Sequence, residues 1–293
     1  MSDNTYSYQE IVCTHALTKL KRSIPYSWDL NIYRGCSHNC TYCYAIYSHA
    51  YIGEQNFSNV FVKSNIIEIL EKELRNPSWN REIINIGGVT DSYQKAESEL
   101  KIMPEVLKLL IKYKTPAIIS TKSGLLLRDY DLIAELSKIT YVNIASTITT
   151  MNESERMILE PGASSSIDRC NMLKEFRKTN ASVGFHVMPI IPYITDTYEN
   201  IENLCIEAAR AQVHYMLPAV LYLRGATKKV FFESVSKQYP LMYDSIKNLY
   251  VKGSAPAEYK ENLYNQIVNP LRNKYSISSS YIKVLREKMH KNN

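Results

Sequence analysis

The chain has 293 residues, of which 45% are hydrophobic and 22% charged, so its composition is that of an ordinary globular protein with one large domain. No run of about 18 apolar residues is present and the N-terminus is polar, so we expect neither a membrane span nor a signal peptide, and a cytoplasmic protein. The net charge of +6 is compatible with an anionic partner, but Lys and Arg are spread along the chain, so the charge alone is weak support for nucleic-acid binding.

Residues 1–28 come before the first clear domain pattern and contain several aromatic side chains, so we expect an extended arm with a short strand. Asp29 to Gly35 alternates polar and apolar residues, as in a short strand, and Gly35 allows the backbone to turn into the next segment. The sequence therefore predicts that a loop begins at the carboxyl end of this strand.

That loop reads CSHNCTYC and carries Cys36, Cys40 and Cys43, separated by three and by two residues. A closed zinc site normally takes four protein ligands. Three thiolates can instead hold a cubane iron–sulfur cluster through three irons, which leaves the fourth iron open to a ligand that is not protein. The other three cysteines are dispersed, and we interpret them as small core residues: Cys13, Cys170 and Cys205.

Strand-like and helix-like segments alternate through the rest of the domain. The predicted strands are 29–35, 82–88, 116–121, 141–146, 182–189 and 215–221. The predicted helices between them include 103–114, 129–138, 165–178 and 197–211. This alternation indicates parallel strands with right-handed crossovers, and six units are two fewer than a closed eightfold barrel. A doubly wound sheet fits the periodicity nearly as well.

The chain thus divides into an arm (1–28), an α/β domain (29–225) and an extension (226–293). The extension is mostly helical in pattern, over 228–251 and 257–275, with breaks at proline and glycine. We expect this tail to close one end of the domain.

Ligands bind at the carboxyl ends of parallel strands, so polar residues that follow the strands are candidates for a site. The second predicted strand leads into GGVTDSYQ (87–94), the third into TKS (121–123) and the fourth into STIT (146–149). Arg169 has two interpretations: a bidentate clamp on a carboxylate, or an ion pair with Glu160 that fixes the loop. His186, within the fifth strand, is interpreted as a core residue.

The cysteine spacing, with Tyr42 just before the last cysteine, resembles the signature of radical S-adenosylmethionine (SAM) enzymes. Over about residues 27–223, five segments resemble the spore photoproduct lyase-like branch of that family: YRGC (33–36), GVTDSYQ (88–94), TKS (121–123), EP (160–161) and PIIP (189–192). The resemblance implies an open, partial (β/α)6 TIM-like barrel. It also implies a [4Fe-4S] cluster on Cys36, Cys40 and Cys43 that cleaves SAM to a 5′-deoxyadenosyl radical.

The same resemblance implies roles for residues around the cluster. Tyr42 would lie against the adenine of SAM, Lys122 would contact the cofactor, and the methionyl amine would be bound by Gly87, Gly88 and Thr90. Ser146 and Arg169 complete the set of predicted cofactor-binding residues. A reducing partner such as flavodoxin or ferredoxin is also implied.

One departure from this branch concerns the hydrogen donor. True spore photoproduct lyases resemble one another in having a donor cysteine near the end of the second strand, where this chain has Val89 and Thr90. Literal repair of the photoproduct is therefore not expected. Tyr93 is the predicted catalytic residue that would replace the cysteine.

Three functions remain open. The leading one is a lyase-type radical enzyme that acts on a bulky substrate, such as a peptide in splicease-type maturation with a separate peptide-recognition protein. The second is a nucleic-acid-modifying or repair lyase, suggested by the net charge and by 23 tyrosines able to stack on bases. The third is a non-catalytic iron–sulfur or zinc protein.

Overall fold

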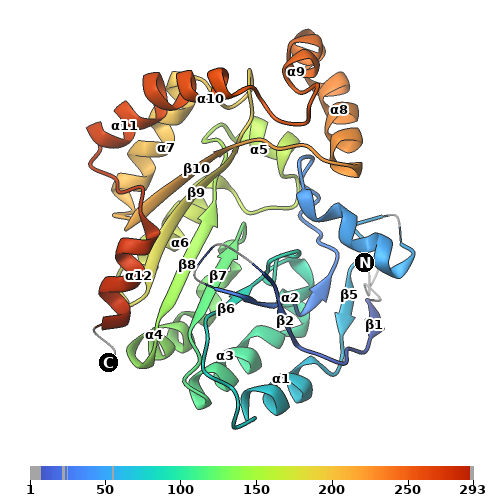
Figure 1. The fold of residues 1–293 in the computed structure, drawn as a ribbon, viewed down its shortest axis with the longest axis vertical. Helices are drawn as coiled ribbons and strands as arrows, with labels where there is room; N and C mark the ends of the chain where they lie inside the picture. Colours follow the sequence, from blue (N-terminus) through green and yellow to red (C-terminus); the bar gives the residue numbers. More distant parts are fainter. Residues whose placement is uncertain (1–7, 22–23, 25, 55, 291–293) are drawn as a thin grey trace, which may run out of the picture.

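The computed structural model describes residues 8–21, 24, 26–54 and 56–290, and Figure 1 shows one large twisted sheet as its centre. The strand order in this sheet is β10-β9-β8-β7-β6-β3-β2. Six of these strands are mutually parallel: β3 (Trp28–Leu30), β6 (Ile84–Ile86), β7 (Ala117–Thr121), β8 (Val142–Thr147), β9 (Ser182–Ile190) and β10 (Tyr215–Val220). The predicted α/β fold with a partial barrel is confirmed.

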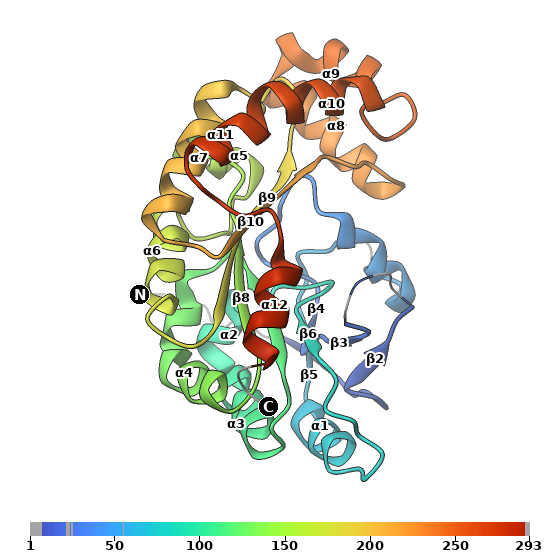
Figure 2. The ribbon, with the colours of Figure 1, turned by 60° about the vertical axis from the view of Figure 1, so that its left-hand side comes forward.

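Helices cover the outer, convex face of the sheet (Figures 1 and 2). The main ones are α1 (Ile66–Leu74), α3 (Ile102–Lys112), α4 (Tyr130–Ile139), α6 (Ser166–Phe176) and α7 (Tyr198–Arg210). Shorter segments lie in the connections: η1 (Tyr44–Ile52), α2 (Lys95–Leu100), η2 (Gly124–Asp129) and α5 (Glu153–Leu159). The apolar stripe of α3 shows why these helices dock, because Val106, Leu107 and Leu110 are fully buried in the core.

Each strand has two faces of different character. Ile84 and Ile86 of β6 pack into the core with the helices, whereas Asn85 between them binds Asp29 of β3 through a 2.9 Å hydrogen bond. The same alternation sets Asn143 of β8 apart from Val142 and Ile144. The concave face of the open barrel therefore carries buried polar groups.

The N-terminal part of the described chain contributes to two sheets. Strand β2 (Leu17–Lys19) extends the main sheet as an antiparallel neighbour of β3. Strands β1 (Gln9–Ile11), β5 (Phe61–Lys63) and β4 (Tyr33–Arg34) form a separate small sheet. The single strand predicted over 29–35 is thus wrong in one respect, because it is divided into β3 and β4, which belong to different sheets. Residues 1–7 of the predicted arm lie outside the described residues.

The C-terminal part is helical, as predicted. It comprises α8 (Ala226–Gln238), η3 (Pro240–Met242), α9 (Tyr243–Leu249), α10 (Ala257–Leu263), the π-helical η4 (Tyr264–Val268), α11 (Asn269–Lys274) and α12 (Tyr281–His290). Figure 2 shows α12 in front of the strands. Its Leu285 is buried with Ile83, Ile118 and Tyr141, two of which directly precede strands, so α12 covers the concave face near the amino ends of the strands. Among the described helices, none is long and apolar enough to cross a membrane.

This packing predicts a stability difference within α12. Leu285→Ala removes a buried side chain from the concave face and is expected to lower the free energy of unfolding by about 2–3 kcal/mol. Ile282→Ala, on the same helix but 40% exposed, is the control and should change it by less than about 0.5 kcal/mol. Urea denaturation measures both values, and equal effects would contradict the docking of α12 on the barrel.

Candidate active site

The cysteine loop, Cys36 to Cys43, has neither helix nor strand, and other segments supply partners for its backbone. The N–H of Cys36 donates to the carbonyl of Phe57 at 2.9 Å, and the N–H of Thr41 donates to the carbonyl of Leu159 at 3.0 Å. The first partner precedes the small sheet, and the second ends α5, after β8. The loop is therefore held by segments that lie far apart in the sequence.

Gln94 holds the start of the loop. It is fully buried, and its Oε1 accepts a 2.7 Å hydrogen bond from the N–H of Ser37, while its Nε2 donates to the carbonyl of Gly35 at 3.1 Å. Thr90 donates its hydroxyl to the same carbonyl of Gly35. The segment after β6 thus forms hydrogen bonds with the backbone on both sides of Cys36.

Two further contacts complete the support. The N–H of Gly162 donates to the carbonyl of His38 at 3.0 Å, and a Cβ at position 162 would lie 2.2 Å from the carbonyl oxygen of Ser37. Any side chain at this position would therefore displace the loop. From α8, the hydroxyl of Thr227 donates to the carbonyl of Cys43 at 2.9 Å.

The three thiols are free cysteines, of which Cys36 is buried and Cys40 and Cys43 are half-buried. Burial raises the pKa of the Cys40 thiol, and burial together with the charge of Cys36 raises the pKa of Cys43 to about 11. Hydrogen bonds from the N–H groups of Ala45 and Ile46 act to lower the pKa of Cys43. Buried thiolates need a cation beside them, and metal binding supplies one because the bound ligand is the deprotonated form.

The donor set fits a three-cysteine cluster site. All three ligands come from one short loop, and each would bind a different iron of a cubane cluster. Among the described residues, no three His, Cys, Asp or Glu side chains are grouped so as to hold one metal ion. That finding concerns a single ion, such as the zinc of the third interpretation, and not a cluster.

A buried ion pair lies beneath the loop. Glu160 and Arg169 are both fully buried and are joined by a 2.7 Å contact between Oε2 and Nη1. The same Nη1 donates to the carbonyl of Thr147 at 2.6 Å, and Tyr42 donates its hydroxyl to Glu160. Burial acts to raise the pKa of Glu160, but Arg169 and Lys122 outweigh it, so this pKa is lowered. Of the two interpretations of Arg169, the ion pair is present.

Lys122 is brought to the cysteines as expected from its place after β7. Its Nζ lies 5.6 Å from the centroid of the Tyr42 ring. Burial acts to lower the pKa of its ammonium group, but Cys40, Glu160 and Cys43 outweigh burial and raise it. Lys122 therefore brings a cation beside the thiol loop.

Asp91 positions this lysine and was not predicted as a site residue. Its carboxylate accepts hydrogen bonds of 2.8 Å from the hydroxyl of Thr121 and from the N–H groups of Lys122 and Tyr93. His38 of the cysteine loop approaches it to 3.3 Å. Burial acts to raise the pKa of Asp91, but His38 and the N–H donors lower it to about 2. Asp91 thus ties the segments after β6 and β7 to the cysteine loop.

Two predicted residues lie elsewhere. The phenol of Tyr93 is 1% exposed and donates to Asp129, at the start of α4, at 3.0 Å. The hydroxyl of Ser146 is fully buried and donates to the carbonyl of Thr121 at 2.7 Å. These contacts hold both residues in the barrel wall, and their roles in quenching and in cofactor binding stay predictions.

The glycine pair is explained first by packing. Gly87 has a φ of +84°, which favours glycine, and a Cβ on Gly88 would lie 2.5 Å from Oδ2 of Asp29. Gly88 also accepts a hydrogen bond from the hydroxyl of Tyr44. The pair therefore lets the segment after β6 pass close to β3 and to η1, beside the cysteine loop.

The concave face next to this site carries a second polar group. Tyr215 donates its hydroxyl to Asn143 at 3.1 Å, and the same oxygen lies 3.5 Å from Nε2 of His186. Burial and the charge of Lys122 lower the pKa of His186 to about 4, so its imidazole is neutral at pH 7. His186 was interpreted as a core residue, but it is half-buried on the face that the barrel leaves open to a ligand.

Comparisons with known proteins agree with this geometry. Residues 30–205 match the Radical SAM superfamily. The chain is 32% identical over 282 residues to an uncharacterized protein, Rv2578c, of Mycobacterium tuberculosis, covering 94% of this chain and 83% of that protein. It is 26% identical over 221 residues to an uncharacterized protein, MJ0683, of Methanocaldococcus jannaschii, covering 75% and 79%. In fold it resembles spore photoproduct lyase complexed with dinucleoside spore photoproduct, with a TM-score of 0.66, 16% identity and coverage of 91% and 78%.

The role of Gln94 can be measured by metal loading. Gln94→Ala leaves the N–H of Ser37 and the carbonyl of Gly35 without this partner, and we expect iron affinity to fall about 10- to 100-fold. Anaerobic titration with iron and sulfide, followed by iron analysis, measures the change. Gln238→Ala, at an exposed position in α8, is the control, and loading equal to that control would contradict the role.

The buried ion pair predicts a large effect on stability. Glu160→Gln leaves the guanidinium of Arg169 uncompensated in the interior and should lower the free energy of unfolding by about 3–5 kcal/mol. Glu175→Gln removes the partner of Lys178 in an exposed pair and should cost less than about 1 kcal/mol. Chemical denaturation of the two variants compares these values, and similar small losses would show that Arg169 is compensated by other groups.

Proposed function

Because this chain belongs to the radical SAM superfamily, we propose that it uses a [4Fe-4S] cluster and SAM to abstract hydrogen from a bulky substrate and to initiate bond cleavage or rearrangement. The observation that carries the proposal is the cysteine loop itself. Three thiols on one loop are held at the carboxyl ends of parallel strands, next to Lys122 and to an open, polar concave face.

Cys36, Cys40 and Cys43 would hold the cluster, which when reduced supplies the electron that cleaves SAM to a 5′-deoxyadenosyl radical. Lys122 would meet the carboxylate or ribose of SAM with its ammonium group. Tyr42 keeps its ring beside that ammonium because its hydroxyl is bound to Glu160. Arg169 acts on this arrangement through Glu160, so we propose that it positions the site and does not clamp the cofactor.

The segment after β6 has a related role. Gly87 and Gly88 bring backbone groups to the edge of the cysteine loop, and we propose that they face the methionyl part of SAM. The hydroxyl of Thr90 donates to the carbonyl of Gly35. Thr90 would therefore support cofactor binding by fixing this segment.

The substrate would lie against the concave face. Asn143, His186 and Tyr215 offer amide, imidazole and phenol groups there, and α12 closes the face at the other end of the strands. An open barrel admits a large molecule to this face, whereas a closed eightfold barrel is filled by its own side chains. A lyase acting on a bulky substrate fits this arrangement.

Two substrate classes follow from the comparisons and the sequence. The spore photoproduct lyase of similar fold was solved with a dinucleoside spore photoproduct, which favours a nucleic-acid substrate. A peptide substrate, matured with a separate recognition protein, is the alternative. To separate the two classes, a candidate peptide and a candidate oligonucleotide are added together, and the measurement shows which of them transfers hydrogen to the 5′-deoxyadenosyl radical.

The first experiment is anaerobic reconstitution with iron and sulfide, reduction with dithionite in the presence of SAM, and assay of 5′-deoxyadenosine and methionine. Production of both supports the proposed function. A fully loaded cluster that yields neither, with or without candidate substrates, would support a non-catalytic cluster instead.

Two cysteine variants make this test specific. Cys40→Ala removes one of the three loop thiols and should abolish cluster loading and 5′-deoxyadenosine formation. Cys205→Ala removes a fully buried thiol that packs against Met216, so activity should remain and stability should fall by about 1 kcal/mol. Retention of activity by the Cys40 variant would overturn the assignment of the cysteine loop.

A further inference from the structure

The positive charge of the chain is concentrated in its C-terminal part, contrary to the even spread expected from the sequence. Residues 226–293 contain twelve Lys and Arg against five Asp and Glu, a net charge of +7. Residues 1–225 contain 23 against 24, a net charge of −1. The whole excess of +6 therefore lies in the helical extension beside the barrel.

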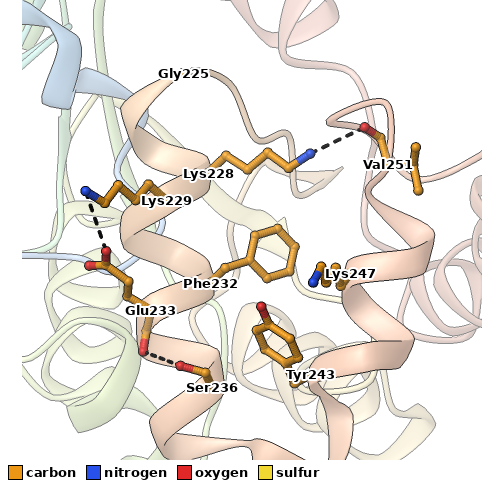
Figure 3. A pocket seen from close by; sticks show the side chains of 9 residues that line it. All are labelled: Gly225, Lys228, Lys229, Phe232, Glu233, Ser236, Tyr243, Lys247 and Val251. Atoms are coloured by element: carbon orange, nitrogen blue, oxygen red, sulfur yellow. Dashed lines mark hydrogen bonds and ion pairs between the residues drawn. The ribbon is translucent and has the colours of Figure 1, made fainter.

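Part of this extension forms a groove between α8 and α9 (Figure 3). The groove has a volume of about 640 Å³, within the range of ligand-binding pockets. Its wall on α8 includes Lys228, Lys229 and Phe232, and its wall on α9 includes Tyr243 and Lys247.

The three lysines of the groove have different surroundings. Lys228 is half-buried and donates to the carbonyls of Tyr250 and Val251, where α9 ends, so it fastens the two helices together. Lys229 is 81% exposed, 3.9 Å from Glu233, and Lys247 is exposed on the opposite wall. Lys229 and Lys247 are therefore the exposed lysines of the two walls, and Glu233, the partner of Lys229, also lines the groove.

Aromatic rings lie between these cations. Phe232 and Tyr243 are half-buried, with ring centroids 5.9 Å apart and planes at 80°. The ammonium group of Lys247 lies 5.3 Å from the centroid of the Tyr243 ring. Partly exposed aromatic rings between lysines suit a ligand that is both planar and anionic, as a nucleotide is.

The groove is next to the candidate active site. Thr227, one residue before Lys228, binds the backbone of Cys43, and α8 packs against η1, which follows the cysteine loop. On η1, Tyr44 and Tyr47 are 63% and 52% exposed. A strand bound in the groove would thus lie close to the mouth of the barrel.

We propose that the α8–α9 groove binds single-stranded nucleic acid, with phosphates at Lys229 and Lys247 and a base against Phe232 and Tyr243. This inference deepens the proposed function and rests on it for the link between the groove and the chemistry. The binding itself is independent of cluster and SAM.

The test uses fluorescence anisotropy of a labelled oligothymidylate of about 12 nucleotides, with the full-length chain, over a series of salt concentrations. Wild-type affinity should fall as salt rises. Lys229→Gln/Lys247→Gln should weaken binding and reduce the slope of log K against log[salt] by about 0.7 per lost contact, or about 1.4 in all. Tyr243→Ala should weaken binding roughly tenfold, with little change in slope.

The control is Lys138→Gln/Lys174→Gln, which removes the same charge from exposed positions on α4 and α6. Circular dichroism confirms that each variant is folded. If the groove variants bind the oligonucleotide as the control does, the proposal is overturned. Unchanged oligonucleotide binding could also come with slower SAM cleavage when flavodoxin, but not dithionite, is the reductant. That result would overturn the proposal as well, because the groove would then dock an acidic protein. Failure of SAM cleavage alone would count against the proposed function and not against the groove.

Discussion

The cysteine loop depends on hydrogen-bond partners from outside itself, and this constraint organises the rest of the site. Buried N–H and C=O groups without partners cost about 1–3 kcal/mol each. Phe57, Gln94, Leu159, Gly162 and Thr227 supply them from four separate segments of the chain. These hydrogen bonds fix the loop against the connections after β6 and β8 and against the start of α8. The positions of the three thiols are fixed as a result.

The ion pair of Glu160 and Arg169 adds a second constraint of a different kind. A buried pair gains little net stability over apolar residues, but breaking it is expensive. Here the carboxylate also accepts a hydrogen bond from the hydroxyl of Tyr42, and the guanidinium donates one to the carbonyl of Thr147 at the end of β8. The pair thus fixes the position of the cysteine loop relative to β8. Its contribution is to select one arrangement of the loop.

The sequence predicted the first parallel strand from its alternating residues and the other five from short apolar runs, and it predicted the cysteine loop from spacing alone. It did not predict the division of 29–35, since β3 and β4 are too short for periodicity to separate. It identified the segments around Tyr93 and Ser146 but not which way their hydroxyls point, because neighbouring positions face opposite sides. Gln94 and Asp91 belong to the motif GVTDSYQ (88–94). Their hydrogen bonds to the cysteine loop could not be predicted, because contacts between distant segments leave no periodic pattern in the sequence.

The distance along the chain between the thiols and their last support has a consequence for biosynthesis. Cys36 to Cys43 leave the ribosome first, whereas Thr227, which binds the carbonyl of Cys43, is made 184 residues later. A nascent chain that stops short of α8 has every thiol but an incomplete cradle. The support of the thiol loop is therefore complete only after α8 has been made and has folded against it.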